Sequence, residues 1–386
     1  MSSQSTTLTA NSPAQPTLLP TPTVTAASPQ TQGETPQQQA VAVFATDTPL
    51  SEPTATEPPL PTNTETPQPT ETPTITPTPS PTPLSLPLPT PPKVTKVQTG
   101  WEPLTIGASV TTLGADANGF VWVGTKNSIT QQSPNDLQIA WNFAANELGL
   151  DDSGIASILG AKDGGVWVGG NGAAYFSGLV WRTFTISDGL ASGVVQAIAE
   201  DNQRRIWLGA SSGLSIWNGA SFFTLSRQTG LPNDEITALL SDGPRMWIGT
   251  NGGGVFRFEN NQLQVFNSDN IGLESNFITA LGKLPDGTLL IGSDQGLMTF
   301  TGSRAEAVDD VPHNRITSIV NAPLAEVWVG TAGGGLHHYS DGQWSRLVDN
   351  GNLPDSNVTA LTVDGYGSLW IATADSKLTR YAYALR

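Results

Sequence analysis

The sequence predicts an all-β domain behind a long disordered segment, and three observations carry this prediction. A phrase with tryptophan between apolar residues and a small residue after them, such as "RMWIGT" (245–250), occurs seven times at intervals of 38 to 45 residues, once with leucine replacing the tryptophan. An apolar stretch rich in β-branched residues, such as "ITALLSD" (236–242), comes before the phrase. Proline is concentrated before residue 99, where 22 of the 30 prolines stand, whereas all 11 tryptophans follow it.

Residues 1–98 form the first predicted region, a disordered Thr/Pro-rich stalk or linker. They contain one glycine, Gly33, and one aromatic residue, Phe44. Such a segment has too little apolar surface to offset the conformational entropy lost on ordering. Stretches such as "TPTPSPTP" (76–83) favour extended, polyproline-like conformations. The second predicted region, 99–386, is long enough for one substantial core.

The repeats in the second region predict four antiparallel strands each. In the fourth repeat these are "ITALLSD" (236–242), "RMWIGT" (245–250), "GVFRFEN" (254–260) and "QLQVFN" (262–267), joined by turns rich in Gly, Asp and Asn. A period near 40 residues with four short strands is typical of the blades of a β-propeller. We expect the second strand to place a large side chain between adjacent blades, at Trp122, Trp167, Trp207, Trp247, Leu290, Trp328 and Trp370.

The first strand of each repeat is expected to lie innermost, because its third residue is always small and suits a crowded axis. These residues are Thr112, Ser157, Ala197, Ala238, Ala280, Ser318 and Ala360. The repeats thus predict an all-β, seven-bladed β-propeller of four-stranded antiparallel blades.

The two ends of the second region predict how the ring closes. The seventh repeat ends one strand short, and "GWEPLTIG" (100–107) stands alone before the first repeat. Its Trp101 matches the position of Trp181 and Trp344 at the start of a fourth strand. We therefore expect residues 100–106 to complete the last blade, which removes an exposed sheet edge.

Charge and composition limit the function classes. The formal charge of −16 repels phosphate backbones and anionic lipid, so we expect no nucleic-acid partner and no membrane insertion by this chain. The absence of cysteine excludes disulfides and thiolate metal sites. No apolar run reaches the ~18–20 residues of a membrane span, and the N-terminus has no signal-peptide pattern. Because Thr/Pro-rich stalks are typical spacers outside bacterial cells, we expect an extracytoplasmic domain, at the cell surface or secreted, whose export or anchoring segment is not in this sequence.

The sequence predicts a non-enzymatic protein without metal or cofactor, since no nucleophile elbow, zinc motif or phosphate-binding loop occurs. His337 and His338 are adjacent on a strand and point to opposite faces, so together they cannot ligate one metal. Asp151–Asp152 and Asp309–Asp310 lack the alternating spacing of a calcium loop. A propeller lyase or hydrolase acting on polysaccharide or an ester, with the loop residue His313 as base, stays open as an alternative.

The loops that lead into the first strands of blades four to seven carry the candidate ligand site. In propellers these loops converge with the second-to-third strand turns on one mouth of the channel. Polar and charged side chains there suit sugar hydroxyls or a peptide, although the same residue types also initiate turns. Trp141 and Trp217, outside the regular register, are the aromatic candidates. The candidate ligand-binding residues are Asp234, Glu235, Asn276, Asn314, Arg315, Ser356 and Asn357.

Laid out in this way, residues 100–386 resemble the two-component regulator propeller family. That repeat reads roughly "GLPSN", "VTALLED", "DGxLWIGT" and "GGGLYRY", and "GLPNDEITALLSDGPRMWIGTNGGGVFRF" (230–258) follows it almost throughout. Members of the family usually form the extracytoplasmic sensor part of histidine kinases or related signalling proteins, and some are thought to sense oligosaccharides. The resemblance implies a sensor module for signal transduction with an oligosaccharide, peptide or protein partner. A structural scaffold for protein interactions is the further alternative.

Overall fold

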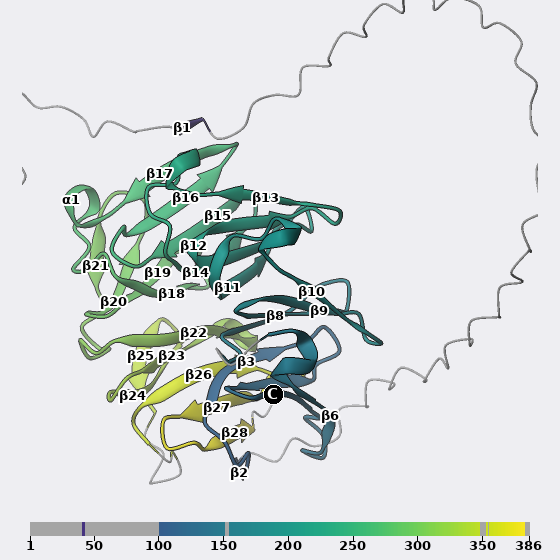
Figure 1. Cartoon of the computed structure of the whole chain (residues 1–386). Helices are drawn as coiled ribbons and strands as arrows, with labels where there is room; N and C mark the ends of the chain where they lie inside the picture. The colour runs from purple at the N-terminus through teal and green to yellow at the C-terminus, as the bar shows by residue number, and fades with distance from the viewer. Residues whose placement is uncertain (1–40, 43–99, 151–153, 348–352, 354, 383–386) are drawn as a thin grey trace, which may run out of the picture. The chain divides into compact units, whose positions relative to one another are not determined.

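The computed structural model describes residues 41–42, 100–150, 154–347, 353 and 355–382 (Figure 1). The segment predicted to be disordered, 1–98, therefore lies outside the described residues except for β1 (Val41–Ala42). This two-residue strand pairs antiparallel with the outer strand of the fourth blade. None of the helices in the described part of the chain is long and apolar enough to cross a membrane.

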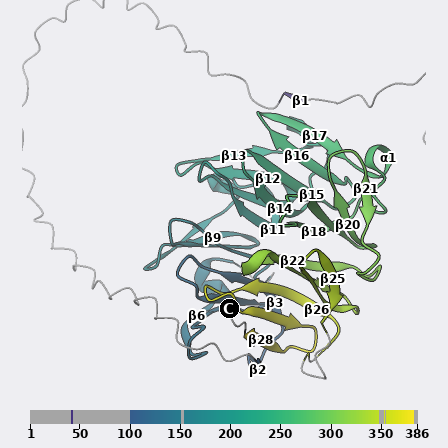
Figure 2. The same ribbon diagram turned by 180° about the vertical axis from the view of Figure 1, so that it is seen from behind.

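The residues from 100 onward form seven antiparallel blades around one axis, as the repeats predict. In Figure 1 the innermost strands of the blades surround the middle of the ring, and the same order is visible from behind in Figure 2. Blade 1 contains β3 (Val110–Ala115), β4 (Val121–Thr125), β5 (Ser128–Gln132) and β6 (Ile139–Ala144), and blade 2 contains β7 (Ser157–Gly160), β8 (Val166–Gly170), β9 (Gly172–Phe176) and β10 (Trp181–Phe184).

Blades 3 to 6 follow in chain order. Blade 3 contains β11 (Ser192–Glu200), β12 (Ile206–Trp217) and β13 (Phe222–Leu225), and blade 4 contains β14 (Ile236–Asp242), β15 (Arg245–Thr250), β16 (Val255–Glu259) and β17 (Gln262–Phe266). Blade 5 contains β18 (Ile278–Lys283), β19 (Leu289–Ser293), β20 (Gly296–Phe300) and β21 (Ala305–Ala307). Blade 6 contains β22 (Ile316–Ala322), β23 (Glu326–Thr331), β24 (Gly335–Ser340) and β25 (Gln343–Arg346). The long strand β12 supplies both middle strands of blade 3, because its first half pairs with β11 and its second half with β13.

The last blade is closed by the strand that precedes the first repeat, as predicted. It contains β26 (Val358–Val363), β27 (Leu369–Thr373), β28 (Leu378–Ala382) and, as its outer strand, β2 (Gly100–Leu104). The antiparallel register joins Gly100 with Ala382 and Leu104 with Leu378. The Trp101 ring lies 4.9 Å from the Tyr381 ring, measured between centroids. Segments from the two ends of the ring therefore share one sheet.

Short helical turns connect several blades and explain the recurrent glycine–leucine pair of the sequence. These turns are η1 (Ala145–Leu148), η2 (Ile186–Asp188), η3 (Arg227–Thr229) and α1 (Ser268–Ile271), while η4 (Pro323–Ala325) joins two strands within blade 6. Each of the first four ends at a glycine with positive φ, a conformation that glycine adopts without strain. The leucine that follows is buried at Leu150, Leu190, Leu231 and Leu273, and it anchors the loop to the core.

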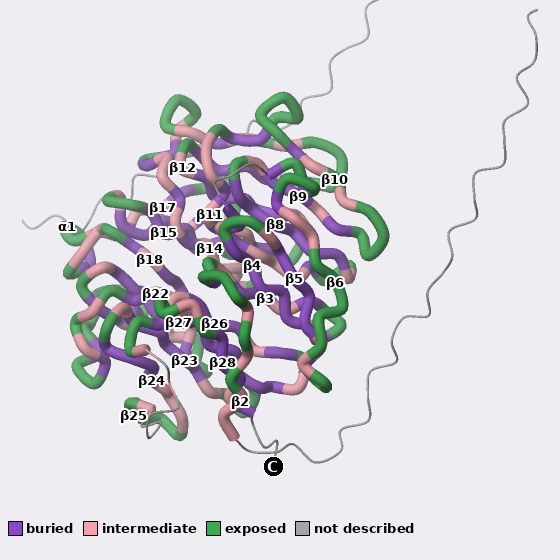
Figure 3. The backbone as a smooth tube through the Cα atoms, turned by 60° about the horizontal axis from the view of Figure 1, so that its bottom comes forward, coloured by how far each residue is buried: buried purple, intermediate pink, exposed green. Residues whose placement is uncertain are grey.

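The seven innermost strands enclose a narrow channel of about 280 Å³. All seven small residues predicted for the axis line it, which confirms that the first strand of each repeat lies innermost. Figure 3 shows buried residues along the strands and exposed residues at the loops and outer turns. The blade cores are therefore formed between sheets, and the surface available for recognition lies at the strand ends.

The predicted tryptophan anchors are buried between blades, and most make the same hydrogen bond. The indole N–H donates to the carboxylate of an aspartate in the turn before its strand, with N–O distances of 2.8 Å in blade 1, 2.9 Å in blades 3 and 7, and 3.4 Å in blade 4. These pairs are Trp122–Asp116, Trp207–Asp201, Trp247–Asp242 and Trp370–Asp364. Blade 5 replaces both partners by buried leucines, Leu290 and Leu284. Blades 2 and 6 keep the tryptophan but have Ala161 and Ala322 in place of the aspartate.

Candidate functional site

The predicted ligand residues lie in the loops that lead into β14, β18, β22 and β26, on one mouth of the channel. These four inner strands pack side by side. The glycine turn of one blade is bound to the loop that leads into the next. The amides of Gly252 and Gly254 donate to the Asn276 carbonyl at 3.0 Å, and those of Gly333 and Gly335 donate to the Ser356 carbonyl at 3.2 and 2.9 Å. The mouth is therefore built on backbone positions held from two blades.

Several of the predicted side chains are engaged within their own loops. Asp234 accepts a hydrogen bond from the Arg227 amide, and Asn276 accepts one from the Ser268 amide at 2.8 Å. Asn314 donates to the Ala332 carbonyl at 3.0 Å. For these three residues the turn-forming role that the sequence analysis considered is present in the structure, because each side chain satisfies a backbone group of a loop.

The remaining predicted side chains are exposed or half-buried at the strand ends. Arg315 is exposed, Glu235 is half-buried, and neither makes a side-chain hydrogen bond or ion pair with another described residue. Asn357 is exposed and donates to Asp355 at 3.3 Å, while Ser356 is exposed beside it. Glu235, Arg315 and Asn357 each stand immediately before an inner strand, so they occupy equivalent positions in blades 4, 6 and 7.

Phe277 occupies the same position in blade 5, and sequence reasoning missed it as an aromatic candidate. Its side chain is 50% exposed, which is uncommon for phenylalanine. The sequence does contain the information, because in "SNFIT" Phe277 stands directly before the first strand of its repeat, as Glu235, Arg315 and Asn357 do in theirs. We call Glu235, Phe277, Arg315 and Asn357 the mouth set. It presents an acid, an aromatic ring, a cation and an amide on four adjacent blades.

The three histidines have separate environments. His313 is exposed near the mouth, and its Nδ1 lies 3.7 Å from a carboxylate oxygen of Glu274. His337 is buried, and burial lowers its pKa. His338 stacks on Trp328 with 4.0 Å between ring centroids and contacts Glu326 at 3.2 Å, while burial raises the pKa of Glu326. The adjacent pair thus serves interblade packing, and only His313 lies where a ligand can reach it.

The acidic pairs considered for calcium are not assembled into a site in the described part of the chain. Asp151–Asp152 lies outside the described residues, and Asp309–Asp310 follows the short strand β21. Within the described ranges, no group of three or more His, Asp or Glu side chains is arranged to hold a metal ion.

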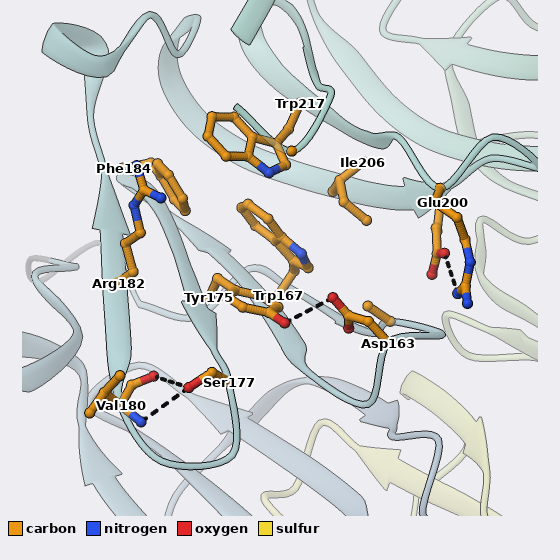
Figure 4. Close-up of a pocket in the computed structure, with 13 residues that line it drawn as sticks. Asp163, Trp167, Tyr175, Ser177, Val180, Arg182, Phe184, Glu200, Ile206 and Trp217 are labelled. Atoms are coloured by element: carbon orange, nitrogen blue, oxygen red, sulfur yellow. Dashed lines mark hydrogen bonds and ion pairs between the residues drawn. The ribbon is translucent and has the colours of Figure 1, made fainter. Parts of the chain in front are cut away.

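A second cavity, of about 520 Å³, lies between blades 2 and 3 (Figure 4). Trp167, Phe184 and Trp217 form an aromatic wall, and Asp163 and Glu200 lie on the opposite side. The predicted aromatic candidate Trp217 is therefore in a pocket. The other candidate, Trp141, is exposed on the outer strand of blade 1 and stacks on Phe143 at 5.6 Å.

Polar side chains in this pocket contact one another or the rings. The Arg182 guanidinium lies over the Phe184 ring at 4.6 Å and near the Trp217 ring at 5.4 Å, as cation–π contacts do. The Tyr175 hydroxyl donates to Asp163 at 2.9 Å. Burial and that carboxylate together raise the pKa of Tyr175 to about 12, so the hydroxyl remains a donor across the ordinary pH range.

Comparison with protein families identifies the repeats. Residues 189–212, 230–252 and 352–375 match the model of the two-component regulator propeller family. Three of the seven repeats therefore match this family's model. The matched segments lie in blades 3, 4 and 7, and they include the fourth repeat, which carried the resemblance in the sequence. No curated protein sequence matches this chain.

Solved structures share the propeller fold. The extracellular domain of the putative hybrid two-component system BT4673 from B. thetaiotaomicron has a TM-score of 0.62 and 17% identity, over 75% of this chain and 40% of that one. A streptogramin B lyase has a TM-score of 0.58 and 16% identity, over 73% and 96%. A catalytically inactive virginiamycin B lyase from Staphylococcus aureus, with quinupristin, has a TM-score of 0.62 and 14% identity, over 74% and 100%. At these identities the likeness concerns the fold.

Proposed function

We propose that this two-component regulator propeller is a non-enzymatic, extracytoplasmic sensor module whose ligand binds the mouth set. The observation that carries the proposal is that four adjacent blades place Glu235, Phe277, Arg315 and Asn357 at equivalent strand ends. Each carbonyl of this set accepts an amide from the end of the second strand of its own blade, at 2.9 to 3.2 Å. Binding groups on positions fixed in this way lose little conformational entropy when a ligand binds.

The chemistry of the mouth set suits a neutral oligosaccharide or a short peptide. The exposed Phe277 ring offers a flat apolar surface, while Arg315 donates, Glu235 accepts and Asn357 does both. A polyanionic ligand is disfavoured by the net charge of −16. The similar BT4673 domain is extracellular, which supports the proposed location.

A thermal-shift screen of the full chain against neutral glycans and short peptides tests this proposal. We expect a ligand to raise the melting temperature, and Phe277→Ala and Arg315→Ala each to reduce that shift by more than half. Leu324→Ala is the matched control, because Leu324 is 62% exposed but lies in the β22–β23 connection, at the other end of β22 from the mouth. Equal shifts in all four proteins would contradict a ligand site at the mouth. No shift across the panel would favour the scaffold alternative.

One observation favours a second candidate function, a lyase. His313 Nδ1 lies 3.7 Å from a carboxylate oxygen of Glu274 near the mouth, which is beyond hydrogen-bond distance but brings together the two residue types that a histidine general base uses. Incubating the full chain with quinupristin, the compound in the virginiamycin B lyase structure, tests it. The sensor proposal predicts an intact compound by mass spectrometry. Turnover that disappears in His313→Ala would overturn the non-enzymatic assignment.

A further inference from the structure

The pocket between blades 2 and 3 exists where one side chain of the repeat is absent. In blades 1, 3, 4 and 7 an aspartate carboxylate accepts the indole N–H of the anchor tryptophan. Blade 2 has Ala161 in that position, and Ala161 and Trp167 both line the pocket. Trp167 is only 3% exposed, yet its indole N–H has no acceptor among the described residues. The indole nitrogen is not among the buried atoms that lack a partner, so this N–H is open to the pocket and can donate to an acceptor from outside.

The remaining polar groups make the pocket rich in open donors and poor in open acceptors. Asp163 accepts hydrogen bonds from the Gly165 amide and the Tyr175 hydroxyl, both at 2.9 Å. Glu200 accepts from the Lys162 amide at 2.7 Å and pairs with Arg204 at 2.9 Å. Each of the four carboxylate oxygens thus already accepts one hydrogen bond or ion pair, and each keeps one further lone pair.

Arg182, on the aromatic side, has open donors. It makes no hydrogen bond with a described residue, and its guanidinium N–H groups remain available above the rings. Together with the Trp167 indole, it gives the pocket open donors from two side chains.

We propose that this pocket binds a proline-rich segment of a partner protein in the polyproline II conformation, with the Trp167 indole N–H donating to a prolyl carbonyl. A prolyl residue has a carbonyl acceptor and no N–H, so it matches a site with open donors and engaged acceptors. The polyproline II helix has no internal hydrogen bonds, which leaves its carbonyls free, and it docks in aromatic-lined grooves.

Other ligand classes fit this pocket less well. Each sugar hydroxyl carries a proton that needs an acceptor, and every carboxylate oxygen of the pocket already accepts from one partner, which reduces the acceptor sites left for a sugar. An anionic ligand would lie beside Asp163 and Glu200 on a protein with net charge −16. The lining contains two acids and two arginines, so its formal charge is zero and matches an uncharged peptide segment.

The rim extends the apolar surface in a way that suits a linear ligand. Val180 lines the pocket and is 66% exposed, and the adjacent Leu179 is 67% exposed. Both lie in the turn between β9 and β10. Figure 4 shows Val180 below Arg182, on the same side of the pocket. A peptide that enters the aromatic pocket can continue across this turn.

Fluorescence anisotropy with the full chain and a labelled acetyl-TPTPSPTP-amide peptide tests the proposal. We expect saturable binding to the wild type. Ala161→Asp should weaken binding at least tenfold, because the new carboxylate would take the Trp167 N–H and occupy the space. Ala322→Asp is the matched control, since it adds the same group at the equivalent position of blade 6 and should leave binding unchanged. Arg315→Ala, in the mouth set, should also leave it unchanged, which separates this site from the proposed sensor site.

The outcomes that would overturn the proposal are distinct. Equal binding to the wild type and Ala161→Asp would place the peptide elsewhere. The chain itself contains the probe sequence at 76–83, which could compete with the peptide for the pocket. The measurement is therefore repeated with a variant of the full chain that has alanine in place of Pro77, Pro79, Pro81 and Pro83. Binding to this variant but not to the wild type would make the occupant the chain's own segment instead of a partner. Absence of binding to both proteins would contradict the proposal, and displacement of the peptide by maltose would favour a sugar as the occupant.

Discussion

Blade 7 and blade 2 place the same tryptophan in the same strand, but the residues around it differ. In blade 7 the Trp370 indole N–H donates to Asp364, whose other oxygen accepts the amides of Tyr366 and Ser368, each at 2.9 Å. Arg380 lies 3.3 Å from the same carboxylate and 3.1 Å from Glu102 on the closing strand.

Blade 2 keeps the tryptophan and loses the carboxylate, and a cavity of about 520 Å³ lies there. Tyr175, which stands across from Trp167 as Arg380 does from Trp370, reaches Asp163 instead. The blade 2 position thus lacks an aspartate that the scaffold position of blade 7 has, and blade 6 shares this loss at Ala322.

The largest expected effect comes from Asp364→Ala. This change leaves Arg380, whose side chain is 11% exposed, without its buried carboxylate, and it leaves the Trp370 N–H without an acceptor. Removal of one partner of a buried charge pair costs about 3–5 kcal/mol. Denaturant unfolding of the full chain should show a loss in this range, whereas a loss below about 1 kcal/mol would show that the network is not structural.

Replacing the tryptophans themselves should reveal the difference between the blades. Trp370→Phe removes a hydrogen bond and leaves Asp364 short of a donor, so we expect it to cost about 1–3 kcal/mol more than Trp167→Phe, which loses no hydrogen bond. Both changes remove a similar amount of apolar surface, so the packing cost largely cancels. Equal losses of unfolding free energy would mean that the indole–carboxylate bond contributes nothing.

A smaller effect is expected in the acid range. Burial raises the pKa of Asp201, but hydrogen bonds from Trp207 and Arg205 outweigh it and hold that pKa below its ordinary value. A depressed folded-state pKa stabilises the fold above the unfolded-state pKa, near 4, and the contribution is lost as the pH falls through the folded value. Stability should therefore decline below about pH 4, with a slope of at most ~1.4 kcal/mol per pH unit from this group. Asp201→Asn should flatten the curve, and an unchanged curve would contradict the assignment.

The ring could be predicted from sequence because its cause is periodic. The spacing of the tryptophans, the small third residue of each first strand and the unpaired segment around Trp101 each reflect a constraint that acts once per blade. The loss of the aspartate at Ala161 is also visible in the sequence, because the second repeat has "AKDGGVW" where the first repeat has "DANGFVW".

The sites were less predictable, because they depend on contacts between blades. Trp217 and Phe184 line one cavity only because blade 3 packs on blade 2, and no local pattern records that contact. Asp234 and Asn276 were predicted from sequence to bind a ligand, but in the structure their side chains accept hydrogen bonds from nearby backbone amides of the loops. Phe277 was overlooked because an aromatic residue before an apolar strand reads as part of the core.

The stability of Ala161→Asp, measured together with peptide binding on the same sample, tests the central claim most directly. If the cavity is a repeat position that lacks its carboxylate, the new side chain should accept the Trp167 N–H as Asp116 accepts that of Trp122. We predict an unfolding free energy raised by about 1 kcal/mol, typical of one restored hydrogen bond, together with loss of peptide binding. A lower unfolding free energy with peptide binding retained would contradict the account.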